Sequence, residues 1–125
     1  MNFHNLSKVC VLTIVALAAV AVMGFQANAG DVTGPNWHHD RVDANTTDVY
    51  KVTFEGGVEA GVAIIGDGDT DLDLSIIDSN GNEVVSQTDL SDACFVEWTP
   101  PRTGQYEIKI TNLGDVYNAY LLMSN

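Results

Sequence analysis

One stretch in the middle of the chain, G-D-G-D-T-D-L-D-L-S-I-I-D-S-N-G-N, constrains the fold more than any other. Between Asp71 and Ile77 large apolar residues alternate with polar ones, which is typical of a strand with one face in a core and one in water. The apolar positions are Leu72, Leu74 and Ile76. The Asn80-Gly81 pair that follows is a strong hairpin signal, because both residues accept the backbone of a tight turn. The sequence therefore predicts a β-hairpin that returns through residues 83–85.

Short apolar runs separated by turn residues continue along the chain. Strands are predicted at residues 46–54, 59–65, 94–98, 106–110 and 116–123. The third and fourth of these read as a second hairpin-like pair around Pro100–Gly104, because proline cannot donate to a β-ladder. Tyr120 and Leu122 are the expected inward residues of the last strand. No helical period occurs beyond residue 29, so the sequence predicts an all-β sandwich or barrel.

The first 29 residues have the features of an export signal. Residues 9–25 are apolar and free of charge, and Ala27-Asn28-Ala29 supplies the small residues that signal peptidase recognises. Residues 1–29 are therefore predicted to be a signal peptide, with an uncleaved anchor as the alternative. Residues 30–45 are expected to form an N-terminal extension or edge strand, and residues 46–125 the folded domain. The predicted location is secreted or periplasmic.

The charge and the cysteine content limit the kinds of partner and the chemistry that are expected. Residues 30–125 contain all 17 acidic residues and four basic ones, a formal charge of −13. Such a surface disfavours nucleic acid and anionic membranes as partners and favours calcium or basic proteins, although solubility alone explains many acidic domains. Cys94 is the single cysteine of this part, so no intrachain disulfide is expected. It lies in phase with Val96 and Trp98, which predicts a buried, inert thiol.

Three stretches carry a family likeness. They are D-x-D-T-D-L-D-L-S-I-I-D-S-N-G-N, V-E-W-T-P-P-R-T-G-Q-Y-E-I-K-I-T-N and the closing Y-N-A-Y-L-L. Over residues 43–125 the chain resembles the bacterial pre-peptidase C-terminal domain, whose relatives include the collagen-binding domains of bacterial collagenases. The resemblance implies an antiparallel jelly-roll-like β-sandwich of about seven to eight strands. It also implies a non-catalytic accessory role, here without a protease ahead of the domain.

The acidic run suggests a calcium site. Calcium prefers six to eight oxygen ligands, which carboxylates on a loop entering a strand can supply together with carbonyls. Asp67, Asp69 and Asp71 are the predicted ligands, and Ca²⁺ is the cofactor they imply. Two alternatives stay open: Asp71 and Asp73 lie on a solvated strand face, or the ligands come from Asp40, Asp43 and Asp48. The second alternative follows the resemblance, because calcium lies near the N-terminal edge of the collagen-binding relatives.

Other site chemistries receive less support. His38 and His39 are adjacent, so on a strand they point to opposite sides and seldom share a metal. The sequence has no nucleophile motif, and the chain is predicted not to be an enzyme. Trp37, Phe95 and Tyr117 are predicted to form an outward aromatic contact surface. The predicted function is a secreted binding module for an extracellular protein or polysaccharide; the alternative is an accessory protein for a separately encoded secreted enzyme. Ligand, partner and oligomeric state are left open.

Overall fold

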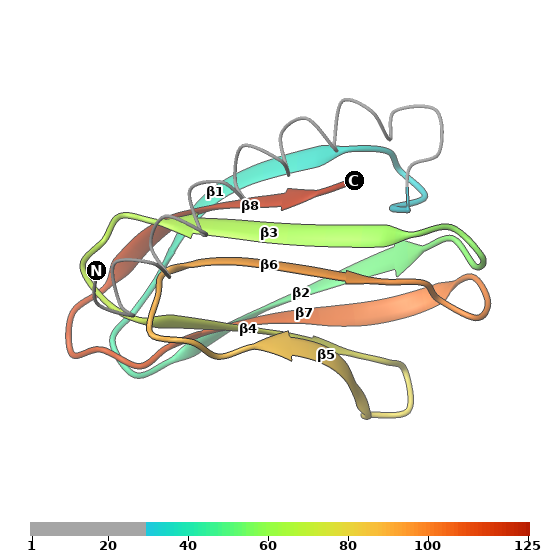
Figure 1. Ribbon diagram of the computed structural model, residues 1–125. Helices are drawn as coiled ribbons and strands as arrows, with labels where there is room; N and C mark the ends of the chain where they lie inside the picture. The colour runs from blue at the N-terminus through green and yellow to red at the C-terminus, as the bar shows by residue number, and fades with distance from the viewer. Residues whose placement is uncertain (1–29) are drawn as a thin grey trace, which may run out of the picture.

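The computed structural model describes residues 30–125, which form two antiparallel sheets of four strands each (Figure 1). The predicted signal peptide, residues 1–29, lies outside the described residues. Within the described part, no helix is long and apolar enough to cross a membrane. The strands are β1 (Asn36–Val42), β2 (Thr47–Phe54), β3 (Ala60–Gly66), β4 (Leu72–Ile77), β5 (Glu83–Gln87), β6 (Ala93–Trp98), β7 (Gly104–Asn112) and β8 (Asn118–Ser124).

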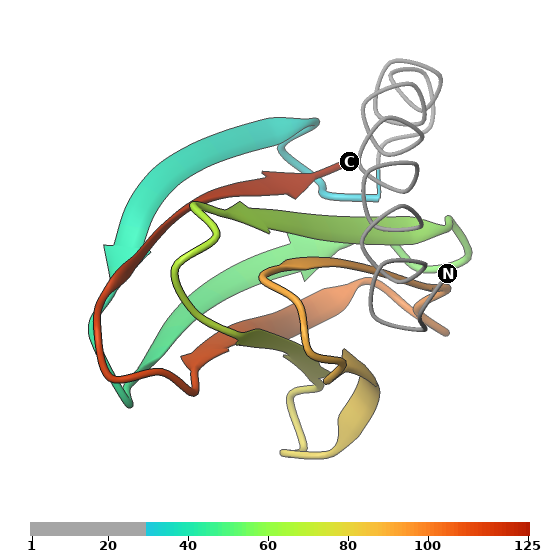
Figure 2. The same ribbon diagram turned by 60° about the vertical axis from the view of Figure 1, so that its left-hand side comes forward.

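The strand order is that of a jelly roll. One sheet has the order β1-β8-β3-β6 and the other β2-β7-β4-β5. Only β4 and β5 are both consecutive in sequence and paired, and every other connection passes from one sheet to the other. Figure 2 shows the two sheets facing each other as layers, with β1 at one margin of its sheet. The predicted antiparallel jelly-roll sandwich is confirmed, and its strand number is eight.

The β4–β5 hairpin matches its prediction. Ile76 pairs with Val85, and the chain reverses through a turn in which Gly81 has a φ of 83°. The Asp78 carboxylate accepts hydrogen bonds from the backbone N–H groups of Asn80 and Asn82, at 2.9 Å each, and so holds the turn. The turn chemistry read from the sequence therefore produces the observed hairpin.

The second predicted hairpin was wrong. β6 pairs with β3 and β7 pairs with β2 and β4, so the two strands belong to different sheets. The connection Thr99–Thr103, which includes Pro100, crosses the end of the sandwich instead of closing a hairpin. Two consecutive prolines stiffen this connection, and a stiff five-residue segment suits an arch between layers better than a tight turn.

The alternation predicted for the strands builds the core between the sheets. Leu72, Leu74 and Ile76 are fully buried. Phe54 lies at one end of this core against Trp98 and Tyr106, with ring centroids 4.8 and 6.0 Å away in edge-to-face geometry. The remaining core members come from β1, β3, β6, β7 and β8: Val42, Ala60, Val62, Ile64, Cys94, Val96, Ile108, Ile110, Tyr120 and Leu122. The inward positions predicted for Cys94, Tyr120 and Leu122 are confirmed.

The segment that precedes β2 contains the edge strand β1. It is tied to the sandwich by Asp31, which is buried and bridges to Phe54. The Asp31 carboxylate accepts hydrogen bonds from the Thr33 N–H and hydroxyl, the Asn36 amide and the Ser124 hydroxyl. Four donors satisfy this buried carboxylate, which fixes where β1 begins.

Candidate functional site

The outer face of the β1-β8-β3-β6 sheet carries a row of apolar side chains across all four strands. The registers place Trp37 opposite Met123, Met123 opposite Ala63, and Ala63 opposite Phe95. We call these four residues the outer row. Met123 and Ala63 are each 2% exposed, and Phe95 packs against them in a cluster separate from the main core. Trp37 is 54% exposed at the β1 end of the row.

A second row widens this apolar face. Leu121 lies opposite both His39 and Ile65, and Ile65 lies opposite Ala93. Leu121 and Ile65 are half-buried and pack against the outer row. Two adjacent rows of apolar side chains on the outer face of a sheet are unusual for a protein in water, and Trp37 is the large hydrophobic side chain of these rows that is exposed.

Two of the three predicted aromatic contact residues, Trp37 and Phe95, share the outer row. Tyr117 does not join them. It lies just before β8, 49% exposed, with the Arg41 guanidinium 4.9 Å from its ring centroid. Arg41 pairs with Ala119, two positions along the strands from the second row. Tyr117 therefore lies next to the first residue of β8, outside both apolar rows.

The sequence prediction does not include the aliphatic part of this face, although the sequence contains a signal for it in two continuous apolar runs. The strand prediction for residues 116–123 assigned only Tyr120 and Leu122 to the inside. The run Tyr-Leu-Leu-Met in β8 and the run Ala60–Ile65 in β3 contain no alternation with polar residues. Continuous apolar runs of this kind are typical of strands covered on both faces.

The predicted calcium ligands have different surroundings in the structure. Asp67 accepts hydrogen bonds from the N–H groups of Asp69 and Ala119, at 3.0 and 2.9 Å. Its carboxylate therefore shapes the loop after β3 and holds the start of β8. Asp69 is exposed in that loop. Among residues 30–125 no group of three or more His, Cys, Asp or Glu side chains is arranged to hold a metal ion.

Asp71 and Asp73 differ from the expected solvated pair. Both are half-buried, and the Oδ1 atom of each is shielded from solvent without a hydrogen-bond partner. Burial raises the pKa of Asp71, and the neighbouring carboxylates of Asp73, Asp89 and Asp92 raise it further. Burial followed by repulsion from Asp89 also raises the pKa of Asp73. The loop between β5 and β6 thus concentrates negative charge over these residues, which a cation would relieve.

Calcium binding by Asp67, Asp69 and Asp71 stays a prediction, with Asp73 as an added ligand, and thermal melts in excess calcium and in EDTA test it. A site filled to about a hundred times its dissociation constant adds roughly 2.7 kcal/mol, or about 10–20 °C in a domain of this size. We expect the shift to disappear in the Asp71→Asn/Asp73→Asn variant and to persist when exposed Asp115 is replaced by Asn. Coincident melts of the unmodified protein would contradict calcium binding.

The alternative acidic set is also dispersed. Asp48 accepts a hydrogen bond from the Tyr120 hydroxyl at 2.7 Å, and Asp40 accepts one from the Tyr50 hydroxyl at 3.1 Å. The two tyrosine hydroxyl oxygens are 2.5 Å apart. Each hydroxyl carries one proton, so the two hydroxyls donate two hydrogen bonds among these three contacts, and either arrangement links the two sheets. Burial raises the pKa of Tyr50 to about 12 and that of Tyr120 further still. Asp43 is exposed near Arg41, outside these contacts. The tyrosines therefore remain neutral donors that fasten the sheets.

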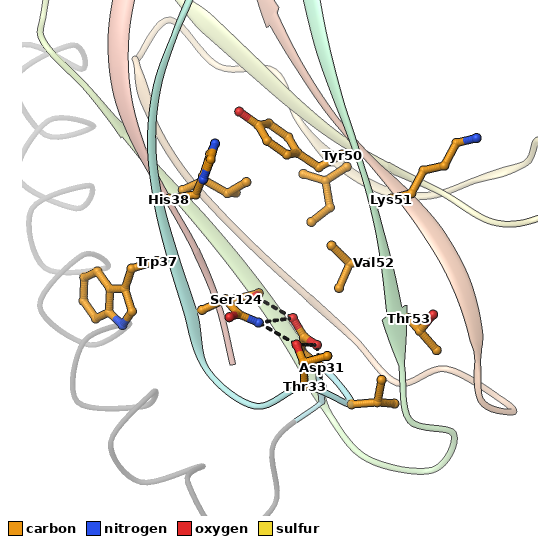
Figure 3. Close-up of a pocket in the computed structure, with 13 residues that line it drawn as sticks. Asp31, Thr33, Trp37, His38, Tyr50, Lys51, Val52, Thr53 and Ser124 are labelled. Carbon is orange, nitrogen blue, oxygen red and sulfur yellow. Dashed lines mark hydrogen bonds between the residues drawn. The ribbon is translucent and has the colours of Figure 1, made fainter.

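A cleft of about 430 Å³ opens between β1 and β2 (Figure 3). Its floor is apolar and includes Val52, while His38 and Tyr50 point toward each other across it with ring centroids 5.3 Å apart. Trp37 points away from the cleft, toward the outer face of its sheet. The Asp31 carboxylate at one end is already satisfied by its four donors. The cleft can accept a small apolar group, and its polar groups are mostly engaged in holding the fold.

Groups suited to catalysis are few among the described residues. Burial raises the pKa of the Cys94 thiol to about 12, and its sulfur lies 3.3 Å from the Leu72 carbonyl oxygen. A thiol in this environment stays protonated and unreactive. A hydrogen bond with Glu59 raises the pKa of Glu97 to about 7, beside the β6 end of the outer face. His38 and His39 point to opposite faces of β1.

The fold resembles solved structures at low sequence identity. The pre-peptidase C-terminal domain of a collagenase from Bacillus anthracis matches with a TM-score of 0.63 and 10% identity, over 72% of this chain and 88% of that one. The Yersinia pseudotuberculosis-derived mitogen matches with a TM-score of 0.60 and 13% identity, over 74% and 85%. PliG from Aeromonas hydrophila, a periplasmic inhibitor of g-type lysozyme, matches with a TM-score of 0.56 and 10% identity, over 79% and 88%.

These likenesses establish a fold like that of the pre-peptidase C-terminal domain, as the sequence resemblance implied. No family model matches the chain, and no curated protein matches it. The same sandwich serves a collagenase domain, a mitogen and a lysozyme inhibitor, so the shared fold leaves the function to the site.

Proposed function

We propose that this protein is a secreted or periplasmic, non-catalytic binding module whose outer β1-β8-β3-β6 face docks onto an extracellular protein. The outer row carries the proposal: Trp37 and Phe95 flank Ala63 and Met123 across four strands. Aromatic anchors beside a covered aliphatic centre resemble the energetic centre of protein interfaces, where Trp and Met are enriched and charged residues depleted.

The chemistry of the face favours a protein over a polysaccharide. Sugar rings require aromatic platforms together with many hydrogen-bonding side chains. Here the outer row is half aliphatic, the second row is mainly aliphatic, and His39 is the one polar side chain in the two rows. The formal charge of −13 over residues 30–125 favours a partner with basic residues at the rim of its docking surface. A protein target is also what the name of the Aeromonas hydrophila neighbour states for that protein.

Capture experiments with matched variants test this proposal. The protein is used as bait in culture medium and periplasmic extract, captured proteins are identified by mass spectrometry, and affinities are measured with the purified partner. We expect a Trp37→Ala/Phe95→Ala variant to bind at least about 30-fold more weakly, because truncating interface aromatics typically costs 2 kcal/mol or more.

The control variant, Val49→Ala/Val84→Ala, removes exposed apolar groups from the opposite sheet and should bind normally. Equal loss in both variants would contradict a specific role for the outer face. Retention on cellulose or chitin, abolished by the same two aromatic changes, would replace the protein partner by a polysaccharide. If the captured partner is a secreted enzyme whose stability depends on the complex, the accessory role applies instead.

A further inference from the structure

The strand β1 has a free edge among residues 30–125. It is the first strand of its sheet, β8 is its one partner within these described residues, and six of its seven residues are exposed. The Arg41 N–H donates to the Asp40 carboxylate at 2.8 Å, so this N–H is directed away from β8. Because N–H directions alternate along a strand, Trp37 and His39 also direct theirs to the free edge. Such an edge is a template for another strand.

The sequence of β1 is complementary to itself when reversed. Residues opposed in a regular antiparallel ladder share one hydrogen-bonding orientation, so a two-fold axis must pass through a residue paired with its own copy. With that axis at His39, the strand N-W-H-H-D-R-V faces its copy along all seven residues. Trp37 then lies opposite Arg41 of the second copy, and His38 lies opposite Asp40. Each of these two pairs occurs twice.

These pairs are favourable on both faces of the strand. On the outer face an indole meets a guanidinium, and Arg41 already lies over an aromatic ring, that of Tyr117. On the inner face each His38 imidazole lies beside an Asp40 carboxylate twice: within its own strand, where the two side chains are 3.7 Å apart, and directly across the pair. An imidazole and a carboxylate are complementary hydrogen-bonding groups, and complementary polar side chains placed directly across an antiparallel pair stabilise it.

Other two-fold registers place less favourable residues opposite each other. An axis at Asp40 would oppose the two Asp40 carboxylates and place Arg41 against His39. An axis at His38 would leave Arg41 opposite Pro35, outside the strand, and Asp40 opposite Asn36. Like charges directly opposed destabilise a pair, and proline cannot donate to the ladder. Only the His39 register uses the whole strand while it places Asp40 opposite His38 and Arg41 opposite Trp37.

We propose that this protein forms a homodimer by antiparallel pairing of β1 with β1 of a second copy, on a two-fold axis at His39. The paired sheets then form one continuous sheet in the order β6-β3-β8-β1 followed by β1-β8-β3-β6 of the second copy. Both outer rows lie on the same side of that sheet, since a two-fold axis perpendicular to a sheet preserves its faces. This dimer requires no external ligand, so its test does not depend on whether the proposed function is correct.

Single cysteines test the register. Opposed residues have Cα atoms about 4.5–5.5 Å apart, within the range that a disulfide spans. We expect His39→Cys, made in the full chain with Cys10→Ser, to form a disulfide-linked dimer under mild oxidation. Trp37→Cys is the matched control on the same face, because its copies would lie about 14 Å apart along the ladder. Cys94 is buried and does not interfere. Equal cross-linking at both positions, or none at His39→Cys, would overturn the proposal.

A charge exchange tests the same dimer without cysteines. His38→Asp should weaken dimerisation on the order of tenfold, because Asp would face the Asp40 carboxylate of the second copy. Adding Asp40→His exchanges the two residues and should restore it. Sedimentation velocity measures both, with Val49→Asp on β2 as a control of equal charge change that should leave the dimer intact. A wild-type protein that stays monomeric at about 100 µM would refute the proposal.

Discussion

Replacing Phe54 by Ala is expected to lower the free energy of unfolding by about 3–5 kcal/mol. Phe54 is fully buried, and its ring contacts those of Trp98 and Tyr106 with centroids 4.8 and 6.0 Å away. Removing the ring loses its burial and leaves a cavity that β-sheet neighbours cannot easily fill. Urea titration followed by tryptophan fluorescence measures the change, because Trp98 packs directly on the missing ring.

The expected loss is a large part of the stability of a small domain, typically 5–15 kcal/mol in total. The melting temperature should fall by at least about 12 °C. Val49→Ala is the matched control on the same strand, because Val49 is 46% exposed and its truncation should cost less than about 0.5 kcal/mol. A cost for Phe54→Ala similar to that of the control would mean that this aromatic cluster is not a fixed part of the core.

Local sequence patterns predicted individual strands and one turn well. The β4 alternation and the Asn80-Gly81 turn are contained within residues 71–85, so the interactions that decide them are near in sequence. The partners of β6 and β7 are far away: Val96 pairs with Val62, and Ile110 pairs with Asp48 and Leu74. Which distant strand completes a sheet depends on how both layers pack, and no local signal carries that information. The second hairpin was therefore predicted where an arch exists.

Only part of the candidate contact surface could be predicted, again because distant strands form it. Trp37 and Phe95 were selected as outward aromatics, yet their shared row exists only because β8 and β3 lie between β1 and β6. Met123 and Ala63 supply the centre of that row, and neither residue type attracts attention in a sequence. Asp67 and Asp69 are predicted calcium ligands because their carboxylates are close in sequence. The structure adds that Asp67 accepts hydrogen bonds from the backbone N–H groups of Asp69 and Ala119, which no sequence pattern indicated.

One buried amide links the ends of the elements that present this face. Asn112 is 1% exposed at the end of β7. The two N–H groups of its Nδ2 serve three carbonyl oxygens, those of Val42, Asp43 and Val116 at 3.2, 3.3 and 2.8 Å, so one N–H is shared between two of them. Its Oδ1 accepts the Gly114 N–H at 2.9 Å. A single side chain therefore joins the end of β1, the turn that follows β1 and the loop that precedes β8.

Replacing Asn112 by Ala is expected to cost about 3 kcal/mol, because it leaves several buried backbone groups without partners. Replacement by Asp should cost more at neutral pH, since a carboxylate would face three carbonyl oxygens and could donate to none of them. Urea unfolding at pH 7 measures both costs. Thr111→Ala is the neighbouring control, because its exposed hydroxyl bonds only to Thr47, at 2.9 Å, and its loss should cost less than about 1 kcal/mol. If Asn112→Asp proved as stable as the unmodified protein, the amide would not be donating to these carbonyls, and the ends of β1 and β8 would be held by the sheet registers alone.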